Sequence, residues 1–415
     1  MSDVQAVILA GGKGTRLRPV TAGLPKPLVP VANRPLILHQ LRHLAAHGVR
    51  DVALALGYAA DRFADIADQG AELGLNVRVI TEPAPLGTGG ALRWCADAGA
   101  FEPDRPLLWM NGDVVASPDI AALERFHLSR GSLVTFWLTS QRDVTQFGVL
   151  ELDGEGFVER FVEKPGPEET PSHLVNSGVL MLAPRVLRRI PPDTFFSFEQ
   201  QLLPLMVRER EPIYGRFDGG YWLDTGNPRA YLAANRHVLE GRVDWEPAGQ
   251  ASSPGLWMGG GAEARERGII KPAAIGAGSV VEEGAQLFGR TVLGDGVRVR
   301  SGARLENCVL FDGVEIGHDA DVYGSVVCAD GRIGDACTLD RSIVGARARM
   351  CGDGGSVGPS SGTRKRSSEV RRKPAGASSA TGSRPMWQPP ARRDQQGSRA
   401  RWVRASSGVG ARTCS

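Results

Sequence analysis

Apolar residues recur at every sixth position in the last third of the chain, and this period constrains the fold more than any other feature. The first run comprises Ile275, Val281, Leu287, Leu293, Val299 and Leu305. After a five-residue step from Phe311 the register resumes at Ile316 and Val322, and it shifts again before Ile333. A six-residue unit that holds one short strand and one turn is typical of a parallel β-helix. A β-sandwich with evenly spaced turns is the alternative, and the constant spacing favours a left-handed β-helix over 269–345.

The first half of the chain alternates short apolar runs with segments of helical spacing. Strands are predicted at 6–10, 51–57, 76–82 and 106–113, and helices at 36–48, from 61, and at 88–98. This order predicts an α/β domain with a Rossmann-like mixed, mostly parallel sheet that is covered by helices on both faces. Ligands of such sheets bind beyond the carboxyl ends of the strands. The glycine-rich loop, Glu82 and Asp113 all follow strands at such ends.

Composition and spacing set the expected domain boundaries. From about 132 to 225 further strands come with fewer helices, and a helix over 228–241 closes the domain. We therefore expect a catalytic domain over 1–242, a linker over 243–268, the β-helix over 269–345, and a disordered tail over 346–415. The tail is rich in Gly, Ser, Arg and Pro and has too little apolar surface to order itself.

The net charge of +3 conceals two opposite parts. The tail from Ala346 holds 15 basic and 3 acidic side chains, which leaves 34 basic and 43 acidic side chains in the first 345 residues. The folded body is therefore acidic, and we do not expect it to bind nucleic acid. Six cysteines without a CxxC pair suit a reducing compartment, and we expect a cytoplasmic protein with neither a signal peptide nor a membrane span.

The stretch LAGGKGTRLRPVT with LPKPLVPV has the residues of a phosphate site. It matches neither G-x-x-x-x-G-K-[ST] nor G-x-G-x-x-G. Even so, glycines let backbone N–H groups approach an anion, and Arg16 can grip phosphate oxygens with its planar guanidinium. Lys26 lies between two prolines, and a fixed cation there suits a reaction that concentrates charge on phosphorus.

Further motifs follow in order, and together they resemble the sugar-nucleotide pyrophosphorylases. The motifs are GY at 57–58, EPAPLGTGGAL at 82–92, NGD at 111–113, FGV at 147–149, FVEKP at 161–165, NSGV at 176–179 and GYWLDTGNPRAY at 220–231. The resemblance covers about 1–240, and the hexapeptide repeats extend it to about 345. The combination with a β-helix is most similar to the mannose-1-phosphate guanylyltransferases.

The resemblance implies a reaction and a set of site residues. A sugar 1-phosphate attacks the α-phosphorus of a nucleoside triphosphate in line, and pyrophosphate leaves. By the family pattern, Asp113 and Asp224 bind Mg²⁺, Arg16 holds the β and γ phosphates, and Lys26 meets the α-phosphate. Lys164 binds the sugar phosphate, and Glu163, Asn176 and Gly148 meet the sugar. The expected nucleotide-binding residues are Leu9, Gly11, Gly12, Gly14, Thr15, Glu82, Gly87 and Thr88.

Several alternatives stay open. Glu82 favours guanine, whose adjacent N1–H and N2–H donors suit one carboxylate, but it can instead bind ribose or a backbone turn. UTP, dTTP or ATP with glucose 1-phosphate, and a non-catalytic regulatory homologue, are the rival functions. An acyltransferase in the β-helix would rest on His318 alone, so we expect that module to support homo-oligomerisation or allostery. His39, His43 and His47 have helical spacing, and we interpret them as part of an ordinary surface helix.

Overall fold

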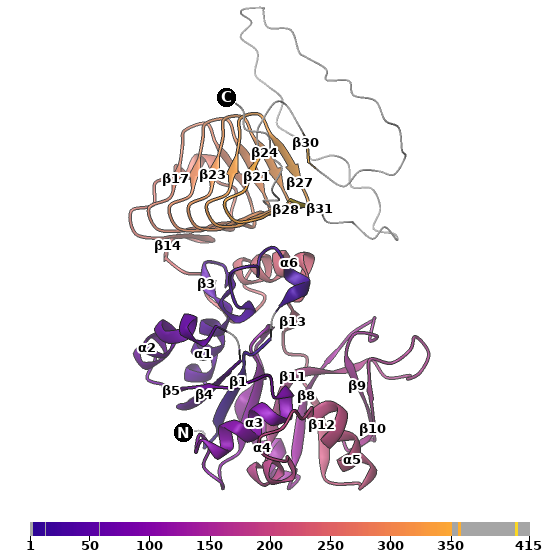
Figure 1. Ribbon diagram of the computed structural model, residues 1–415. Coiled ribbons are helices and arrows are strands. Elements are labelled where there is room, and N and C mark those ends of the chain that lie inside the picture. The colour runs from indigo at the N-terminus through magenta and orange to yellow at the C-terminus, as the bar shows by residue number, and fades with distance from the viewer. Residues whose placement is uncertain (1–2, 13, 58, 351–355, 358–402, 406–415) are drawn as a thin grey trace, which may run out of the picture.

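The computed structural model describes residues 3–12, 14–57, 59–350, 356–357 and 403–405. Helices surround a central sheet in the N-terminal part, and short strands stack into a column in the C-terminal part (Figure 1). Most of the tail predicted to be disordered over 346–415 lies outside the described residues.

The central sheet has the strand order β10-β9-β11-β6-β1-β4-β5, with β8 beside β11 and β12 beside β8. Its strands are β1 (Gln5–Leu9), β4 (Asp51–Leu56), β5 (Asn76–Thr81), β6 (Leu107–Asn111), β8 (Val134–Ser140), β9 (Gly148–Leu152), β10 (Val158–Glu163), β11 (Leu174–Leu182) and β12 (Ile213–Phe217). The strands β6, β1, β4 and β5 run parallel, whereas β11 runs antiparallel to β6 and β8. The predicted mixed α/β sheet is confirmed.

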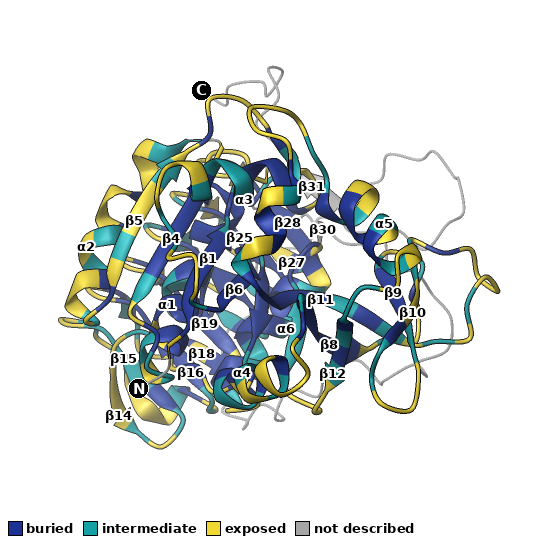
Figure 2. Cartoon of the chain, turned by 90° about the horizontal axis from the view of Figure 1, so that it is seen from below, coloured by how far each residue is buried: buried dark blue, intermediate teal, exposed yellow. Residues whose placement is uncertain are grey.

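The side chains of the buried strands point alternately to the two faces of the sheet, so the apolar core has two layers. The helices are α1 (Leu36–Ala46), α2 (Ala64–Glu72), α3 (Gly87–Asp97), α4 (Ile120–Ser129), α5 (Leu203–Arg208) and α6 (Pro228–Leu239). Successive strand residues point to opposite faces. Ile8 of β1 therefore packs in one core with Leu41 of α1, and Val7 packs in the other with Leu92 of α3. Figure 2 shows the buried central strands, with α2 and β5 largely exposed at one side.

Four helical elements between residues 120 and 208 were not among the predicted ones. They are α4, the 3₁₀ helix η4 (Pro184–Arg189), the π-helix η5 (Phe198–Leu202) and α5. The start of α4 carried a sequence signal, because Asp119 caps it by accepting a hydrogen bond from the Ala122 amide at 2.9 Å. The segment 184–208 passes through three helix types in short pieces, so no single period marks it.

The C-terminal strands form the three sheets of a parallel β-helix. They are β14 (Gln250–Ser253), β15 (Leu256–Met258), β16 (Ala273–Ile275), β17 (Val280–Val281), β18 (Gln286–Phe288), β19 (Thr291–Leu293), β20 (Arg298–Val299), β21 (Arg304–Glu306), β22 (Val309–Leu310), β23 (Glu315–Ile316), β24 (Asp321–Tyr323), β25 (Val326–Val327), β26 (Arg332–Ile333), β27 (Thr338–Asp340), β28 (Ser342–Val344), β29 (Arg349–Met350), β30 (Ser356–Val357) and β31 (Val403–Ala405). Every third strand joins the same sheet from β16 onward. The handedness of the coil stays a prediction.

The strand register explains the break in the six-residue period. Ile275 pairs with Leu293, three six-residue units later, whereas Leu293 pairs with Leu310, one residue short of three units. Leu310 lies in the β-helix core, and Phe311 packs outward against the N-terminal domain. The five-residue step was expected after Phe311, but it lies before Leu310.

The β-helix is longer at both ends than expected. The segment 243–268 was predicted to be a linker, but β15 pairs in parallel with β16 and β14 pairs with β15. At the other end β29 pairs with β26 beyond the predicted limit of 345. Apolar spacing alone missed β14, because none of the side chains in QASS is a large apolar one.

One face of the β-helix packs against the N-terminal domain. Val292, Val309, Val326 and Ile343 of its eight-stranded sheet share a buried core with α6 and with Val31 of β2 (Pro30–Val31). The Asn33 side-chain amide donates to the Leu293 carbonyl at 2.6 Å, and Arg290 pairs with Glu240. This face is covered within one chain, and the contact between chains stays a prediction.

Tyr231 of α6 gives a stability prediction. Its buried hydroxyl donates to the Pro30 carbonyl at 2.6 Å, and its ring meets Phe311 of the β-helix. We expect Tyr231→Phe to lower the free energy of unfolding by about 1–3 kcal/mol, because the carbonyl loses its buried donor. Urea unfolding followed by tryptophan fluorescence measures this change. Tyr323→Phe, at a residue that is 41% exposed, is the matched control, and equal losses for the two variants would contradict the prediction.

Candidate active site

The glycine-rich loop that follows β1 turns back on itself at Gly14. This residue has φ +57°, and its carbonyl accepts a hydrogen bond from the Thr21 hydroxyl at 2.7 Å. A Cβ atom at Gly14 would lie 3.0 Å from the Cβ of Lys26, so only glycine fits without strain. The turn leads into the 3₁₀ helix η1 (Thr15–Leu17), which presents the exposed side chain of Arg16.

Lys26 forms the electrostatic centre of the site. It begins the 3₁₀ helix η2 (Lys26–Leu28) and is only 4% exposed. Its Nζ donates to Asp113 Oδ2 at 2.8 Å and to Asp224 Oδ1 at 3.3 Å. A buried ammonium group requires such partners, because removal from water is costly for an unpaired charge. Arg16 lies 3.8 Å from Asp224, so two cations and two carboxylates meet at one point.

Strand pairing brings the two aspartates together from positions far apart in the sequence. Asp113 follows β6, and the chain continues into β7 (Val114–Ala116). Asp224 ends β13 (Trp222–Asp224), and it pairs with Val114 in an antiparallel register. The Thr225 hydroxyl donates to the Asp113 carbonyl at 3.0 Å, which fixes the two segments against each other.

A polar cavity of about 580 Å³ opens beside this cluster. Its lining includes seven predicted residues: Arg16, Asp113, Gly148, Glu163, Lys164, Asn176 and Asp224. A Cβ at Gly148 would lie 2.7 Å from the Phe161 ring and 2.9 Å from Glu163 Oε2, so glycine is required for this approach. Lys164 Nζ lies 3.4 Å from Glu163 Oε1, and its side chain is 60% exposed. The cavity thus holds donors and acceptors for a phosphorylated polyol.

The residues predicted to bind the nucleotide lie outside this lining. Leu9, Gly11, Gly12, Gly14, Thr15, Glu82, Gly87 and Thr88 are placed at the ends of β1 and β5 and at the start of α3. The hydroxyl of Thr88 is engaged within the protein, since it donates to Glu199 Oε2 at 2.5 Å and accepts from the Phe198 amide at 3.0 Å. The Thr88 hydroxyl therefore has protein partners both as a donor and as an acceptor.

Glu82 lies against the glycine loop and closes a turn. Its Oε2 accepts a hydrogen bond from the Leu86 amide at 3.0 Å, and a Cβ at Gly11 would lie 3.3 Å from Oε1. The backbone-turn alternative for Glu82 is thus present in the structure. A guanine contact through both oxygens stays a prediction, and Oε2 would have to share that contact with Leu86.

The cavity also contains residues that sequence reasoning missed. Ser197, Glu199 and Gln200 line it from the segment at η5, and Phe147 and Trp222 form an aromatic wall with ring centroids 5.6 Å apart. Trp222 belongs to the motif GYWLDTGNPRAY, and its indole donates to the Ser177 carbonyl at 2.7 Å. The sequence around η5 carried no motif that would have identified Glu199.

His39 and His43 of α1 and His47, which follows this helix, do not form a surface face. His39 is 1% exposed and bonds the Val31 carbonyl at 2.9 Å, and His43 is 6% exposed and bonds the Pro118 carbonyl at 3.0 Å. Burial lowers the pKa of His39 to about 3 and that of His43 to about 4. The interpretation of an ordinary surface helix was wrong for these two residues, which pack inward as neutral side chains.

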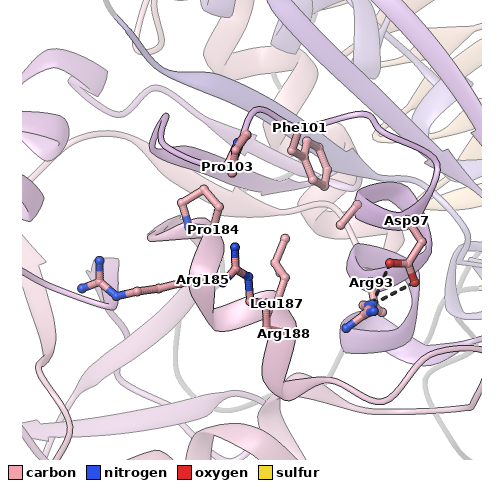
Figure 3. A pocket seen from close by; sticks show the side chains of 9 residues that line it. Arg93, Asp97, Phe101, Pro103, Pro184, Arg185, Leu187 and Arg188 are labelled. Atoms are coloured by element: carbon pink, nitrogen blue, oxygen red, sulfur yellow. Dashed lines mark hydrogen bonds and ion pairs between the residues drawn. The ribbon is translucent and has the colours of Figure 1, made fainter.

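A second cavity of about 280 Å³ lies between the C-terminal half of α3 and η4 (Figure 3). Arg93 is paired there with Asp97 at 2.8 Å and donates to the Ile190 carbonyl at 3.2 Å. None of the predicted site residues lines this cavity. The chemistry therefore belongs to the larger cavity beside Lys26.

Comparison with known proteins agrees with this geometry. A model described as nucleotidyl transferase matches residues 5–241, which is more than half of the chain. The chain belongs to the nucleotidyl transferase family. A model described as the GMPPB C-terminal domain matches residues 269–353, so it covers most of the β-helix.

Three curated relatives share the name of one enzyme. The mannose-1-phosphate guanylyltransferase of Mycobacterium tuberculosis (strain ATCC 25618 / H37Rv) is 35% identical over 76% of this chain and 81% of its own length. Mannose-1-phosphate guanylyltransferase 1 of Arabidopsis thaliana is 30% identical over 82% of this chain and 90% of its own length. The mannose-1-phosphate guanyltransferase of Schizosaccharomyces pombe (strain 972 / ATCC 24843) is 39% identical over 55% of this chain and 62% of its own length.

Two features of the described residues bear on the expectations about a membrane span and a metal. None of the helices there has both the length and the apolar character that a bilayer crossing requires. No group of three His, Cys, Asp or Glu side chains in the same residues is arranged to hold a metal ion.

Burial of Glu82 yields a prediction about stability and pH. Desolvation raises the pKa of this carboxyl above its ordinary value of 4.5, so the folded state binds the proton more tightly than the unfolded state. Below pH 4.5 the Glu82 carboxyl is protonated in both states, so its burial costs no stability. As the pH rises through the folded pKa, the buried group has to ionise and the folded state loses stability. Glu82→Gln keeps an acceptor for Leu86 without the charge, so we expect it to be more stable than the wild type at pH 7 and equally stable at pH 4.

Urea unfolding between pH 4 and pH 8 measures this difference. Glu168→Gln, at an exposed glutamate, is the matched control. A difference between Glu82→Gln and the wild type that stays constant with pH would contradict the desolvation argument.

Proposed function

We propose that the chain transfers a guanylyl group from GTP to mannose 1-phosphate, which yields GDP-mannose and pyrophosphate. The observation that carries this proposal is the cluster of Lys26, Asp113 and Asp224 at the edge of a cavity that holds Lys164, Glu163 and Asn176. The names of the relatives supply the choice of guanine and mannose.

The residues present fit a magnesium ion. Oxygens of Asp113 and Asp224 converge on one cation, the Lys26 ammonium, so their geometry allows a shared cation ligand. Mg²⁺ is commonly held by one or two carboxylates, with substrate phosphates and water completing its six ligands. When bound between Asp113 and Asp224, Mg²⁺ would neutralise charge on the nucleotide phosphates.

Three cationic side chains each bind a different phosphate group in this proposal. An oxygen of the sugar phosphate forms a bond to the α-phosphorus, the bond from that phosphorus to the bridging β-oxygen breaks, and pyrophosphate leaves. We assign Lys26 to the α-phosphate, Arg16 to the departing β and γ phosphates, and Lys164 to the phosphate of the sugar. The nucleophile is already an anion, so none of these residues has to remove a proton.

The sugar side of the cavity supplies hydroxyl acceptors. The carboxylate of Glu163 and the side-chain oxygen of Asn176 can accept hydrogen bonds from sugar hydroxyls. Asn176 Oδ1 is held in place by the Gly178 amide at 2.9 Å. Gly148 leaves the backbone open to the sugar ring.

We infer a reducing compartment, the cytoplasm, as the site of action. Cys95, Cys308 and Cys328 are free and buried among the described residues. Burial raises the pKa of Cys95 and Cys308 to about 12, which keeps these thiols protonated and unreactive.

Pyrophosphate release across a matrix of nucleotides and sugar 1-phosphates tests the function. We expect GTP with mannose 1-phosphate and Mg²⁺ to give the highest kcat/KM. Asp113→Asn should lower kcat by more than about 100-fold, because a cation site that stabilises the transition state is lost. Preference for UTP, dTTP or ATP with glucose 1-phosphate would overturn the substrate assignment, and full turnover by Asp113→Asn would overturn the metal assignment.

The position of Lys26 predicts that its ammonium group competes with a metal ion for Asp113 and Asp224 in the nucleotide-free protein. In Lys26→Met the two aspartates lose their shared cation, so we expect Mn²⁺ to bind the nucleotide-free protein about tenfold more tightly or better. Free Mn²⁺ measured by electron paramagnetic resonance gives the affinity without any turnover. We also expect this variant to lose kcat more than nucleotide affinity.

Two further variants control this measurement. Lys164→Met removes a more exposed lysine from the same cavity and should leave Mn²⁺ affinity unchanged. Adding Asp113→Asn to Lys26→Met should abolish the gain. Equal Mn²⁺ affinities of the wild type and Lys26→Met would show that the lysine does not occupy the cation position.

A further inference from the structure

Glu199 lies where the nucleotide loop meets the sugar cavity. It belongs to the π-helix η5, which Ser197 caps by accepting a hydrogen bond from the Gln200 amide at 3.2 Å. Single π-turns interrupt regular helical hydrogen bonding and often occur at functional sites. Here the turn places Ser197, Glu199 and Gln200 on the wall of the 580 Å³ cavity.

The first turn of α3 is docked onto the segment that carries Glu199. The amides of Gly89 and Gly90 donate to the Phe196 carbonyl at 2.9 and 3.0 Å, and the Phe196 amide donates to the Leu86 carbonyl at 2.8 Å. A Cβ at Gly87 or Gly90 would lie 2.7 Å from a backbone oxygen of this segment. The glycines of the GTGG stretch are therefore needed for this close docking.

Two side-chain links strengthen the docking. Thr88 donates to Glu199 Oε2 at 2.5 Å and accepts from the Phe198 amide at 3.0 Å. At the other end of α3, Arg93 donates to the Ile190 carbonyl just after η4, and Figure 3 shows it beside Asp97 on the same helix. The helix α3 is thus tied at both ends to the stretch between η4 and η5.

Glu199 also faces the sugar side. The carboxylates of Glu163 and Glu199 line the same cavity, and burial together with the Glu163 charge raises the pKa of Glu199. Charged carboxylates only accept hydrogen bonds, so hydroxyl donors between them relieve their mutual repulsion. A polyol in the cavity would therefore hold Glu199 in the position that receives Thr88.

We propose that Glu199 is a positioning residue that couples the two substrate sites through its hydrogen bond to Thr88. Sugar phosphate in the cavity fixes Glu199, Glu199 fixes Thr88 and the first turn of α3, and the ordered turn binds the nucleotide more tightly. This inference rests on the proposed function. It adds that each substrate tightens the binding of the other by the same factor, as thermodynamic linkage requires.

The test compares binary and ternary affinities. Calorimetry measures the Kd of the α,β-methylene analogue of GTP with Mg²⁺, in the absence and in the presence of mannose 1-phosphate. We expect the sugar phosphate to tighten analogue binding about tenfold in the wild type. We expect this factor to fall below about twofold in Glu199→Gln and in Thr88→Val.

Conservative variants separate coupling from a purely structural role. Thr88→Ser keeps the hydroxyl and should keep the coupling factor, and the double variant Thr88→Val with Glu199→Gln should lose no more than either single variant. Thr145→Val, at a half-buried residue, and Glu168→Gln, at an exposed one, lie outside the cavity and are the matched controls. Thermal unfolding confirms that each variant is folded before binding is measured.

The outcomes distinguish this inference from the proposed function. Wild-type protein that binds neither substrate overturns the proposed function. Wild-type protein that binds both without coupling overturns the role of Glu199 and leaves the function standing. The role of Glu199 is also overturned if a folded Glu199→Gln variant keeps tenfold coupling, or if the losses in the double variant are additive.

Discussion

The buried ammonium of Lys26, held between Asp113 and Asp224, is the interaction on which the catalytic domain depends. A charge that is 4% exposed is stable only if its partners are fixed, and both carboxylates come from strand ends that pair with one another. The same pairing leads into α6, which begins four residues after Asp224. The cluster therefore links the sheet edge, the glycine loop and the helix that supports the β-helix.

The arrangement also explains how a mostly acidic body can accept two anionic substrates. Arg16 and Lys164 are the basic residues of the cavity lining, and Lys26 joins them from a third segment through its contacts with Asp113 and Asp224. Two of the three are paired with carboxylates across the site, and Lys164 is paired with its neighbour Glu163. Paired cations keep their orientation in the substrate-free protein, and phosphate groups can replace the carboxylates as partners.

The β-helix and the catalytic domain share one buried core, so they are more than two units joined by a linker. The outward-facing residues of one sheet pack on α6, and Phe311 contributes to this interface while its neighbour Leu310 fills the coil. The helix α6 therefore connects the strand that ends at Asp224 to the β-helix.

The sequence by itself determined the fold class, the domain order and the residues of the cation cluster, because strand and helix periods and ordered motifs are local properties of the chain. It missed the helices over 184–208, the true inward position of Leu310, the burial of His39 and His43, and the place of Glu199. These depend on which surfaces meet after folding, and such contacts leave no fixed spacing in the sequence. Only the tertiary structure decided that Thr88 bonds Glu199 and that Lys26 stands between two aspartates, since those partners are 111, 87 and 198 residues apart.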